Sequence, residues 1–400
     1  MRVKLGKMEN RFLCVIGFLF YGCIEPFETS FVDFESALVI DGTITNELKQ
    51  QEVFLSRTYE FEDDGPTAES TADVSVSDGE GNTYTFQHIA NGLYRSEQAF
   101  AAQSGRNYEL SVITQDGRNY GSDPTQLTAT TSIDEISVER ITDDQGQDGV
   151  AILVDSFDPT GNAKNYRYEF IETYRVISPT WNPISLEPAP EPGCEVIKVP
   201  NTTDEQICYP TSFSNNIILT STEDLEEDRV SNFMVRFINR NNYIMSHRYS
   251  ILVRQLVQSN EAYAFFETLN ELSGSESLFS ETQPGFLQGN VFSKEDSNER
   301  VLGFFDVASV SEKRIFFNYD DLYPGEPLPP YLDPCRPSSP PLINMGGRCV
   351  LRPLIENGAG IYFADNGEQG DNEGPYLVVP RVCGDCKELG PTEVPDFWIE

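Results

Sequence analysis

Cysteines are the residues of this sequence whose number and spacing bear most directly on chemistry. The chain has eight cysteines, and those of its body are Cys194, Cys208, Cys335, Cys349, Cys383 and Cys386. The last four could supply the thiolates of a zinc site, whereas an even number in an exported chain favours disulfides. We expect disulfides. Cys194 is expected to pair with Cys208, since no other cysteine lies near them in sequence, and the other four to pair among themselves.

Residues suited to acid–base or nucleophilic catalysis are scarce. The two histidines, His88 and His247, lie among residues expected to form strands, and no Gly-x-Ser-x-Gly motif accompanies either of them. We therefore expect no Ser-His-Asp hydrolysis. Acidic residues are so abundant that no carboxylate pair for glycoside hydrolysis can be singled out before the distances between carboxylates are known. The sequence indicates a protein without catalytic residues, and thus not an enzyme.

Two short acidic stretches and two tryptophans are the remaining candidates for ligand binding. Residues 143–149 and 365–371 have the oxygen-rich, glycine-containing composition that suits Ca²⁺. Neither has the spacing of an EF-hand, so we interpret both as solvated loops and expect no metal and no cofactor. Trp181 and Trp398 lie in irregular segments, where they either bind a ligand or pack a loop against a sheet.

The N-terminal stretch indicates export. Basic residues up to Arg11 precede a short apolar run, residues 12–20, which is shorter than the about 20 residues that span a bilayer and is typical of a secretory signal. Gly22-Cys23 at its end resembles the lipobox of bacterial lipoproteins. We expect residues 1–22 to be a lipoprotein signal peptide and Cys23 to be the site of lipid attachment. The alternatives are a plain signal peptide cut elsewhere and a single-pass anchor.

The charge of the chain excludes two classes of partner. The formal net charge is −36 and is spread over the whole length. Binding to nucleic acid depends on Lys and Arg that neutralise phosphates, and attraction to an anionic membrane surface also needs basic residues. We therefore expect no nucleic-acid partner, and membrane attachment only through the lipid. Solubility outside the cell explains the acidic composition.

From residue 37 onward the sequence is typical of an all-β protein. Residues 73–77 alternate apolar and polar side chains, a turn follows at Asp78-Gly79, and residues 83–86 resume the alternation. Similar short strands are expected at 38–44 (with a turn signal at Asp41-Gly42), 51–56, 93–95, 105–112 and 119–120. After a tether over residues 23–36, this spacing predicts an immunoglobulin-like β-sandwich over residues 37–130.

A larger β-rich domain is expected over residues 131–400. Its strands are predicted at 150–155, 165–171, 233–238, 249–256, 289–292, 303–307 and 313–317. One prominent helix is expected to start after Ser259-Asn260 and to end at Gly274, because apolar residues between them recur at helical spacing. The Pro-rich residues 178–212 are predicted to form an Ω-like loop closed by Cys194 and Cys208, and residues 335–386 a poorly patterned tail.

The order of several short motifs resembles one known family. Cys-Ile-Glu-Pro-Phe-Glu at 23–28 is followed by Val-Ile-Asp-Gly-Thr-Ile-Thr-Asn at 39–46 and Pro-Gly-Phe-Leu-Gln-Gly-Asn-Val at 284–291, and Cys-Gly-Asp-Cys at 383–386 comes near the end. Together they resemble the Bacteroidota lipoprotein family labelled domain of unknown function 4249, over nearly the whole chain. The resemblance implies a surface lipoprotein, often encoded beside TonB-dependent outer-membrane transporters. It implies no reaction, since the family has no settled catalytic residues.

Taken together, these patterns predict a non-enzymatic lipoprotein that is anchored in the outer membrane through Cys23 and faces the cell exterior. We expect it to serve an outer-membrane β-barrel, such as a TonB-dependent transporter, that captures or admits a ligand. The first sandwich would act as a stalk, and the larger domain would meet the partner. The alternatives are a stand-alone ligand-binding or adhesion lipoprotein and a hydrolase based on carboxylates.

Overall fold

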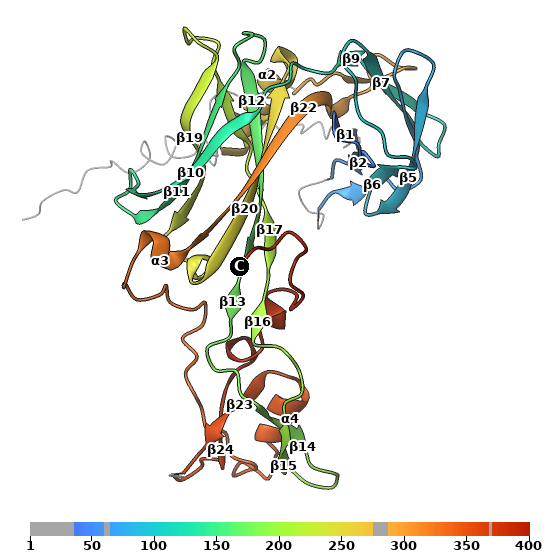
Figure 1. The fold of residues 1–400 in the computed structure, drawn as a ribbon. Helices are drawn as coiled ribbons and strands as arrows, with labels where there is room; N and C mark the ends of the chain where they lie inside the picture. Colours follow the sequence, from blue (N-terminus) through green and yellow to red (C-terminus); the bar gives the residue numbers. More distant parts are fainter. Residues whose placement is uncertain (1–35, 60–64, 275–286, 368–369) are drawn as a thin grey trace, which may run out of the picture.

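The computed structural model describes residues 36–59, 65–274, 287–367 and 370–400, and the predicted mainly β fold is confirmed. Figure 1 shows two β-rich lobes side by side at one end of the molecule and a narrow extension at the other. Helix α2 (Asn260–Gly274) lies at the end opposite the extension. The expected signal peptide and Cys23 lie outside the described residues, as does the tether up to residue 35.

The first lobe contains the strands that the sequence predicts, in one hydrogen-bonded path, and two short strands that it did not predict, Thr67–Ala68 and Thr125–Gln126, which pair off this path. Val74 and Val76 are buried while the residues between and beside them are not, so the predicted alternation is confirmed there. The path does not establish an immunoglobulin-like topology, which stays a prediction. The strands are β1 (Leu38–Thr45), β2 (Glu52–Arg57), β3 (Thr67–Ala68), β4 (Asp73–Ser77), β5 (Thr83–Ala90), β6 (Leu93–Ser96), β7 (Asn107–Ile113), β8 (Asn119–Ser122) and β9 (Thr125–Gln126).

Two strands from much later in the chain complete the first lobe. β21 (Val291–Ser293) pairs with β8, and the first half of β22 (Val301–Asn318) pairs in parallel with β1. Gly303 allows the close approach, because a Cβ there would overlap the carbonyl oxygen of Ile40. The sequence assigned these strands to the second region. It also split β22 in two, because the polar residues at its centre, where its partner changes from β1 to β20, break the apolar pattern.

The second lobe is a pair of sheets with a core of apolar side chains. One sheet contains β10 (Ile133–Thr142), β11 (Asp148–Phe157) and β19 (Arg229–Asn239). The other contains β12 (Asn165–Tyr174), β17 (Thr211–Phe213), β18 (Ile218–Ser221), β20 (Arg248–Gln258) and the second half of β22. Short helical turns, η1 (Tyr243–Met245) and α3 (Tyr319–Leu322), lie beside these strands. The predicted helix is confirmed as α2, and its first turn is capped by the Ser259 hydroxyl, which accepts a hydrogen bond from the Ala262 N–H at 3.1 Å.

An ion pair between a buried glutamate and a partly exposed arginine joins the two sheets of the second lobe. Glu172 of β12 is 5% exposed and accepts hydrogen bonds from Nε and Nη2 of Arg236 on β19, both at 3.1 Å. The hydroxyls of Tyr249 and Ser212 donate to the same carboxylate. Because every oxygen of this buried carboxylate has donors, its negative charge is compensated.

The extension combines two distant parts of the chain around a small core of its own. The sequence predicted a loop and a patternless tail here, because the strands are short and are interrupted by proline and glycine. Each part instead contributes a hairpin. The elements are β13 (Val176–Ile177), β14 (Ile184–Pro188), β15 (Val196–Pro200), β16 (Ile207–Cys208), α4 (Leu351–Glu356), β23 (Gly360–Asp365), β24 (Tyr376–Pro380), η2 (Arg381–Cys383) and η3 (Cys386–Glu388).

Three disulfides hold the extension together, and the predicted pairing of Cys194 with Cys208 is wrong. The bridges are Cys194–Cys349, Cys208–Cys386 and Cys335–Cys383. The β14–β15 hairpin carries Cys194 to the far end of the extension, whereas Cys208 in β16 lies near the lobes (Figure 1). Closeness in sequence therefore did not translate into closeness in space. The alternative of a four-thiolate zinc site is also wrong, since each of its sulfurs is bonded to another sulfur.

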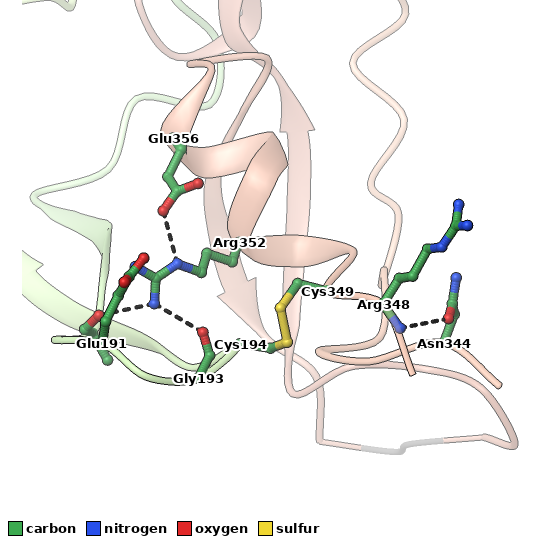
Figure 2. Close-up of a disulfide and its surroundings, with 9 residues drawn as sticks. Glu191, Gly193, Cys194, Asn344, Arg348, Cys349, Arg352 and Glu356 are labelled. Carbon is green, nitrogen blue, oxygen red and sulfur yellow. Dashed lines mark hydrogen bonds and ion pairs between the residues drawn. A yellow bond between two sulfur atoms is a disulfide. The ribbon is translucent and has the colours of Figure 1, made fainter. Parts of the chain in front are cut away.

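Figure 2 shows how the disulfide between Cys194 and Cys349 is supported by Arg352 of α4. The guanidinium of Arg352 donates hydrogen bonds to the carbonyl oxygens of Ala189 at 3.0 Å and Gly193 at 2.9 Å, and to Glu356 at 2.7 Å. Gly193 immediately precedes one bridged cysteine, and α4 starts soon after the other. The arginine and the disulfide thus hold the same loop against the same helix.

Candidate ligand-binding cleft

The strands of the two lobes meet in a cleft made of two adjoining hollows, of about 270 and 480 Å³. Four charged residues line both hollows: Asp41 of β1, Arg167 and Glu169 of β12, and Arg254 of β20. Side chains alternate between the faces of a strand. The neighbours Ile40, Tyr168 and Val253 are therefore buried in the two cores, while the charged side chains point into the cleft.

The two hollows differ in chemistry. The smaller hollow is also lined by polar side chains, Thr43, Thr45, Lys49 and Glu52 among them. The larger hollow is also lined by apolar side chains, which include Ile171, Phe213, Ile217, Phe266 and Leu269. The charged residues thus lie between a polar and an apolar compartment. A ligand that spans both hollows would need a polar and an apolar part.

Arg254 is fully engaged by the protein. Its guanidinium donates to Glu47 at 2.6 Å and to Glu169 at 2.9 Å, and lies 3.8 Å from Glu312. Burial opposes the ionisation of Glu47, but the Lys49 hydrogen bond and the Arg254 charge outweigh this effect and lower the pKa of its carboxyl. Arg254 therefore holds the strands together at the cleft and has little capacity left for a ligand.

Arg167 is much less engaged. Its guanidinium carbon lies 4.3 Å from the centre of the Phe266 ring. Nη2 donates a long hydrogen bond of 3.4 Å to the Thr43 hydroxyl and lies 3.5 Å from a Glu169 oxygen. Nε is buried, and no acceptor for it exists among the described residues. Since a guanidinium carries five N–H donors, Arg167 keeps donors free in the cleft.

Asp41 is an unpaired carboxylate on the floor of the cleft. No hydrogen bond or ion pair joins it to the part of the chain that the structure describes. Solvent reaches the side chain, but the surrounding protein displaces part of its hydration and so raises the pKa of the carboxyl, an effect that the Arg167 charge opposes. The sequence suggested a turn at Asp41-Gly42, but β1 continues through both residues to Thr45.

A second carboxylate, Asp306 of β22, is buried opposite Thr43, two residues along β1 from Asp41. It is 1% exposed, and its carboxylate accepts a hydrogen bond of 2.9 Å from the Gln258 amide. Burial raises the pKa of its carboxyl, the Arg167 charge opposes that rise, and the Asp41 charge adds to it. Oδ1 of Asp306, Oε1 of Gln258 and Oδ1 of Asn165 are buried acceptors for which the described residues provide no donor. Asn165 and Gln258 lie opposite each other on adjacent strands.

We expect Asp306→Asn to raise the free energy of unfolding at neutral pH by about 1–3 kcal/mol, because it removes a buried charge that lacks an ionic partner. The pKa of Asp306 in the folded protein lies above its ordinary value of 3.8. The folded state therefore binds more protons than the unfolded state between 3.8 and the raised value, and this carboxyl reduces stability as the pH rises through that window.

Urea unfolding of wild type and Asp306→Asn at about pH 4 and pH 8 tests this expectation. The gain in the free energy of unfolding of Asp306→Asn over wild type should be larger at pH 8 than at pH 4. Asp144→Asn, at an exposed position, controls for the loss of one acidic residue. An advantage of Asp306→Asn that is the same at both pH values would contradict the prediction.

The two histidines lie outside this cleft. His88 Nε2 accepts a hydrogen bond from the Gly92 N–H at 3.3 Å, and its ring packs against Tyr94 with a distance of 5.3 Å between ring centres. Burial lowers the pKa of His247, and the Arg175 charge adds to this effect. Hydrogen bonding and packing explain the position of His88.

Neither acidic stretch gathers carboxylates in the described part of the chain. The Asp143 carboxylate accepts hydrogen bonds from the N–H groups of Gln145 and Gln147, at 2.9 and 2.7 Å, and so stabilises the turn between β10 and β11. The group of possible metal ligands found within the described residues is Asp333 with Cys335 and Cys383. Its two sulfurs form a disulfide, so it is not a metal site.

The two tryptophans also lie outside the cleft. Trp398 packs against Tyr209 and Phe316, with ring centres 5.0 and 5.8 Å apart, which holds the segment around it on β22. The indole N–H groups of Trp181 and Trp398 are both buried, without an acceptor among the described residues. Packing of a loop against a sheet is thus the observed role of Trp398.

Sequence reasoning missed the residues of the cleft. Asp41 and Arg167 belong to different lobes, and each alternates with buried apolar neighbours in the way that any exposed strand residue does. Their alternation showed only that both point away from a core.

Among the described residues, none of the helices combines the length and the apolar character needed to cross a membrane.

Comparison with known proteins gives a family but no activity. No curated protein matches the sequence. Among solved structures, Escherichia coli alpha-2-macroglobulin activated by porcine elastase is similar over 57% of this chain and 19% of that one, with 10% identity and a TM-score of 0.17. This chain thus spans less than a fifth of that protein, and so low a score carries no argument. Residues 24–314 match the family model described as Domain of unknown function (DUF4249). Since this match covers well over half of the sequence, the chain belongs to the DUF4249 family.

Proposed function

We propose that this protein is a non-enzymatic lipoprotein of the outer membrane, anchored through Cys23 and facing the cell exterior. The observation that carries the proposal is the set of three disulfides, because disulfides persist in oxidising compartments outside the cytoplasm. The short apolar run that ends at Gly22-Cys23 supports export by a separate argument, from the sequence.

In this proposal the protein is an accessory subunit of an outer-membrane complex, such as a TonB-dependent transporter. The first lobe, for which we keep the immunoglobulin-like assignment as part of the proposal, follows the anchor and acts as a stalk. The larger part meets the partner. The tight turn after Ile343 supports a contact role for the extension, because Met345 there is 89% exposed and an exposed apolar side chain gains from burial at an interface.

Ligand binding without a membrane partner is the second candidate, and the cleft between the lobes favours it. Arg167 and Asp41 face this cleft with incomplete partners. A carboxylate-based hydrolase finds less support, since Asp306 is enclosed by protein and lines neither hollow.

Gentle extraction of outer membranes from the native bacterium, followed by affinity purification of the tagged protein, tests the leading proposal. We expect wild type to be recovered from the outer-membrane fraction together with a β-barrel protein. Cys23→Ala should appear in the soluble fraction and lose that partner. Cys14→Ala is a matched control, because it removes the other N-terminal cysteine, and it should stay in the membrane. Recovery of wild type without any β-barrel would overturn the accessory role, and membrane retention of Cys23→Ala would overturn the anchor.

A further inference from the structure

We propose that the cleft binds a small zwitterion with an apolar group, either an amino acid with an apolar side chain or a short peptide of such residues. Arg167 binds the carboxylate of this ligand, Asp41 binds its ammonium group, and the apolar hollow receives its side chain. This inference goes beyond the membrane role and does not depend on it.

Arg167 is positioned by the protein while several of its donors remain free. Stacking on Phe266, at 4.3 Å, fixes the plane of the guanidinium. The protein engages Nη2 through a 3.4 Å hydrogen bond to Thr43 and a 3.5 Å ion pair with Glu169, and both contacts are long. Nε is buried, and no described residue accepts a hydrogen bond from Nη1, so the two terminal nitrogens are the donors open to a ligand. A carboxylate can accept two parallel hydrogen bonds from such a fork, so it is the group that Arg167 suits best.

The side of the cleft around Asp41 favours a positive charge. Asp41 offers a carboxylate that no described residue neutralises by direct contact. Three buried oxygens, on Asp306, Gln258 and Asn165, have no donor among the described residues, but these residues are 1%, 4% and 2% exposed and line neither hollow. Gln258 is hydrogen-bonded to Asp306, and Asp306 pairs in register with Thr43, two residues from Asp41. Asp41 itself, with the Asp306 carboxylate close to it, thus makes this side of the cleft negative, which attracts an ammonium group.

Charge balance selects a zwitterion over an ion of one sign. A purely anionic ligand would have to approach Asp41 and Glu169, which line both hollows, in a chain whose formal net charge is −36. A purely cationic ligand would leave the free donors of Arg167 without an acceptor. A ligand with one positive and one negative group compensates the charges of both Asp41 and Arg167.

The neighbouring hollow suits an apolar side chain. Its volume of about 480 Å³ falls within the range of roughly 300–1,000 Å³ that small-molecule sites occupy. Phe266, whose ring also stacks on Arg167, forms part of its wall. Phe213, on the short strand β17, is 69% exposed at the same hollow. An apolar group placed here would cover Phe213, which pairs with Ile171, four residues along β12 from Arg167.

Calorimetric titration of the full chain, purified in detergent, with L-leucine, L-phenylalanine and leucyl-leucine tests the inference. We expect saturable binding of at least one of the three, and the dipeptide distinguishes a short peptide from a free amino acid. Arg167→Met and Asp41→Asn should each weaken binding by about 10–100-fold. N-acetyl-leucine lacks the ammonium group and leucinamide lacks the carboxylate, so both should bind wild type at least about tenfold more weakly than leucine does.

Loss of discrimination separates recognition from a merely structural effect. Asp41→Asn should no longer distinguish leucine from N-acetyl-leucine, and Arg167→Met should no longer distinguish leucine from leucinamide. Arg229→Met is a matched control, since Arg229 also stacks on a phenylalanine, Phe157 at 4.1 Å, but lies on β19 and lines neither hollow. It should bind as wild type does.

Three outcomes would overturn the inference. They are no binding of any of the three zwitterions at about 10 mM, equal binding of leucine and its blocked forms, and equal effects of Arg229→Met and Arg167→Met. If Arg167→Met does not fold, Arg167→Lys carries the test, because it keeps the charge but loses the paired donors. Full affinity in Arg167→Lys would contradict bidentate recognition.

Discussion

Replacing Arg236 by methionine is expected to lower the free energy of unfolding by about 3–5 kcal/mol. The variant leaves the Glu172 carboxylate, which is 5% exposed, with the hydroxyls of Tyr249 and Ser212 but without a positive charge. A buried and uncompensated charge costs far more than the ion pair itself contributes. Chemical unfolding of wild type and variant at pH 7 measures the difference.

Arg229→Met, on the same strand, is the matched control for this prediction. Arg229 forms an exposed ion pair with Glu227 at 3.4 Å, and exposed pairs contribute only about 0–1 kcal/mol. The double variant Arg236→Met with Glu172→Gln should recover a large part of the lost free energy of unfolding, since it also removes the unpaired charge of the Glu172 carboxylate. A loss for Arg236→Met as small as that for Arg229→Met would show that Glu172 is not effectively buried.

Removing the bridge between Cys208 and Cys386 by two serine substitutions is expected to lower the free energy of unfolding by about 2–5 kcal/mol. The two cysteines are separated by 178 residues, whereas Cys335 and Cys383 are separated by 48. These separations do not distinguish the two bridges, because with the other two intact either one closes the same short ring, formed by residues 194–208, 335–349 and 383–386. Cys208 and Cys386 are fully buried in the core of the second lobe, so serine hydroxyls would be poorly accommodated there.

The measurement is chemical unfolding under non-reducing conditions, with the other two bridges intact. The double serine variant of Cys335 and Cys383 is the matched comparison, and it should lose less stability. Limited proteolysis should also cut the extension faster in the Cys208 and Cys386 variant, because this bridge joins the extension to the lobes. An equal loss of stability in the two variants would rule out the dependence on burial.

The parts of the fold that could be predicted from the sequence are those set by local patterns. Val74 and Val76 alternate with polar residues, and Ser259 precedes a helical stripe, so β4 and α2 appear as predicted. Their structure depends on residues within a few positions, where side-chain periodicity and capping are visible in the sequence.

The remaining features depend on contacts between distant residues. The pairing of β1 with β22 and the partner of Cys194 are set by the path of the chain through space, which local patterns do not record. The same reason hides the cleft. Asp41 and Arg167 are ordinary outward-facing strand residues until the two lobes bring them together.

The shared strand β22 also sets the order in which the protein can fold. β1 is an inner strand whose second neighbour, the first half of β22, is made more than two hundred residues later. Until then β1 is an open edge available to other chains, and the first core lacks Val301, Phe305 and Val307. A chain that emerges from its N-terminus must therefore keep this edge unpaired until β22 has been made. Such late closure makes folding slow and couples the unfolding of the two lobes.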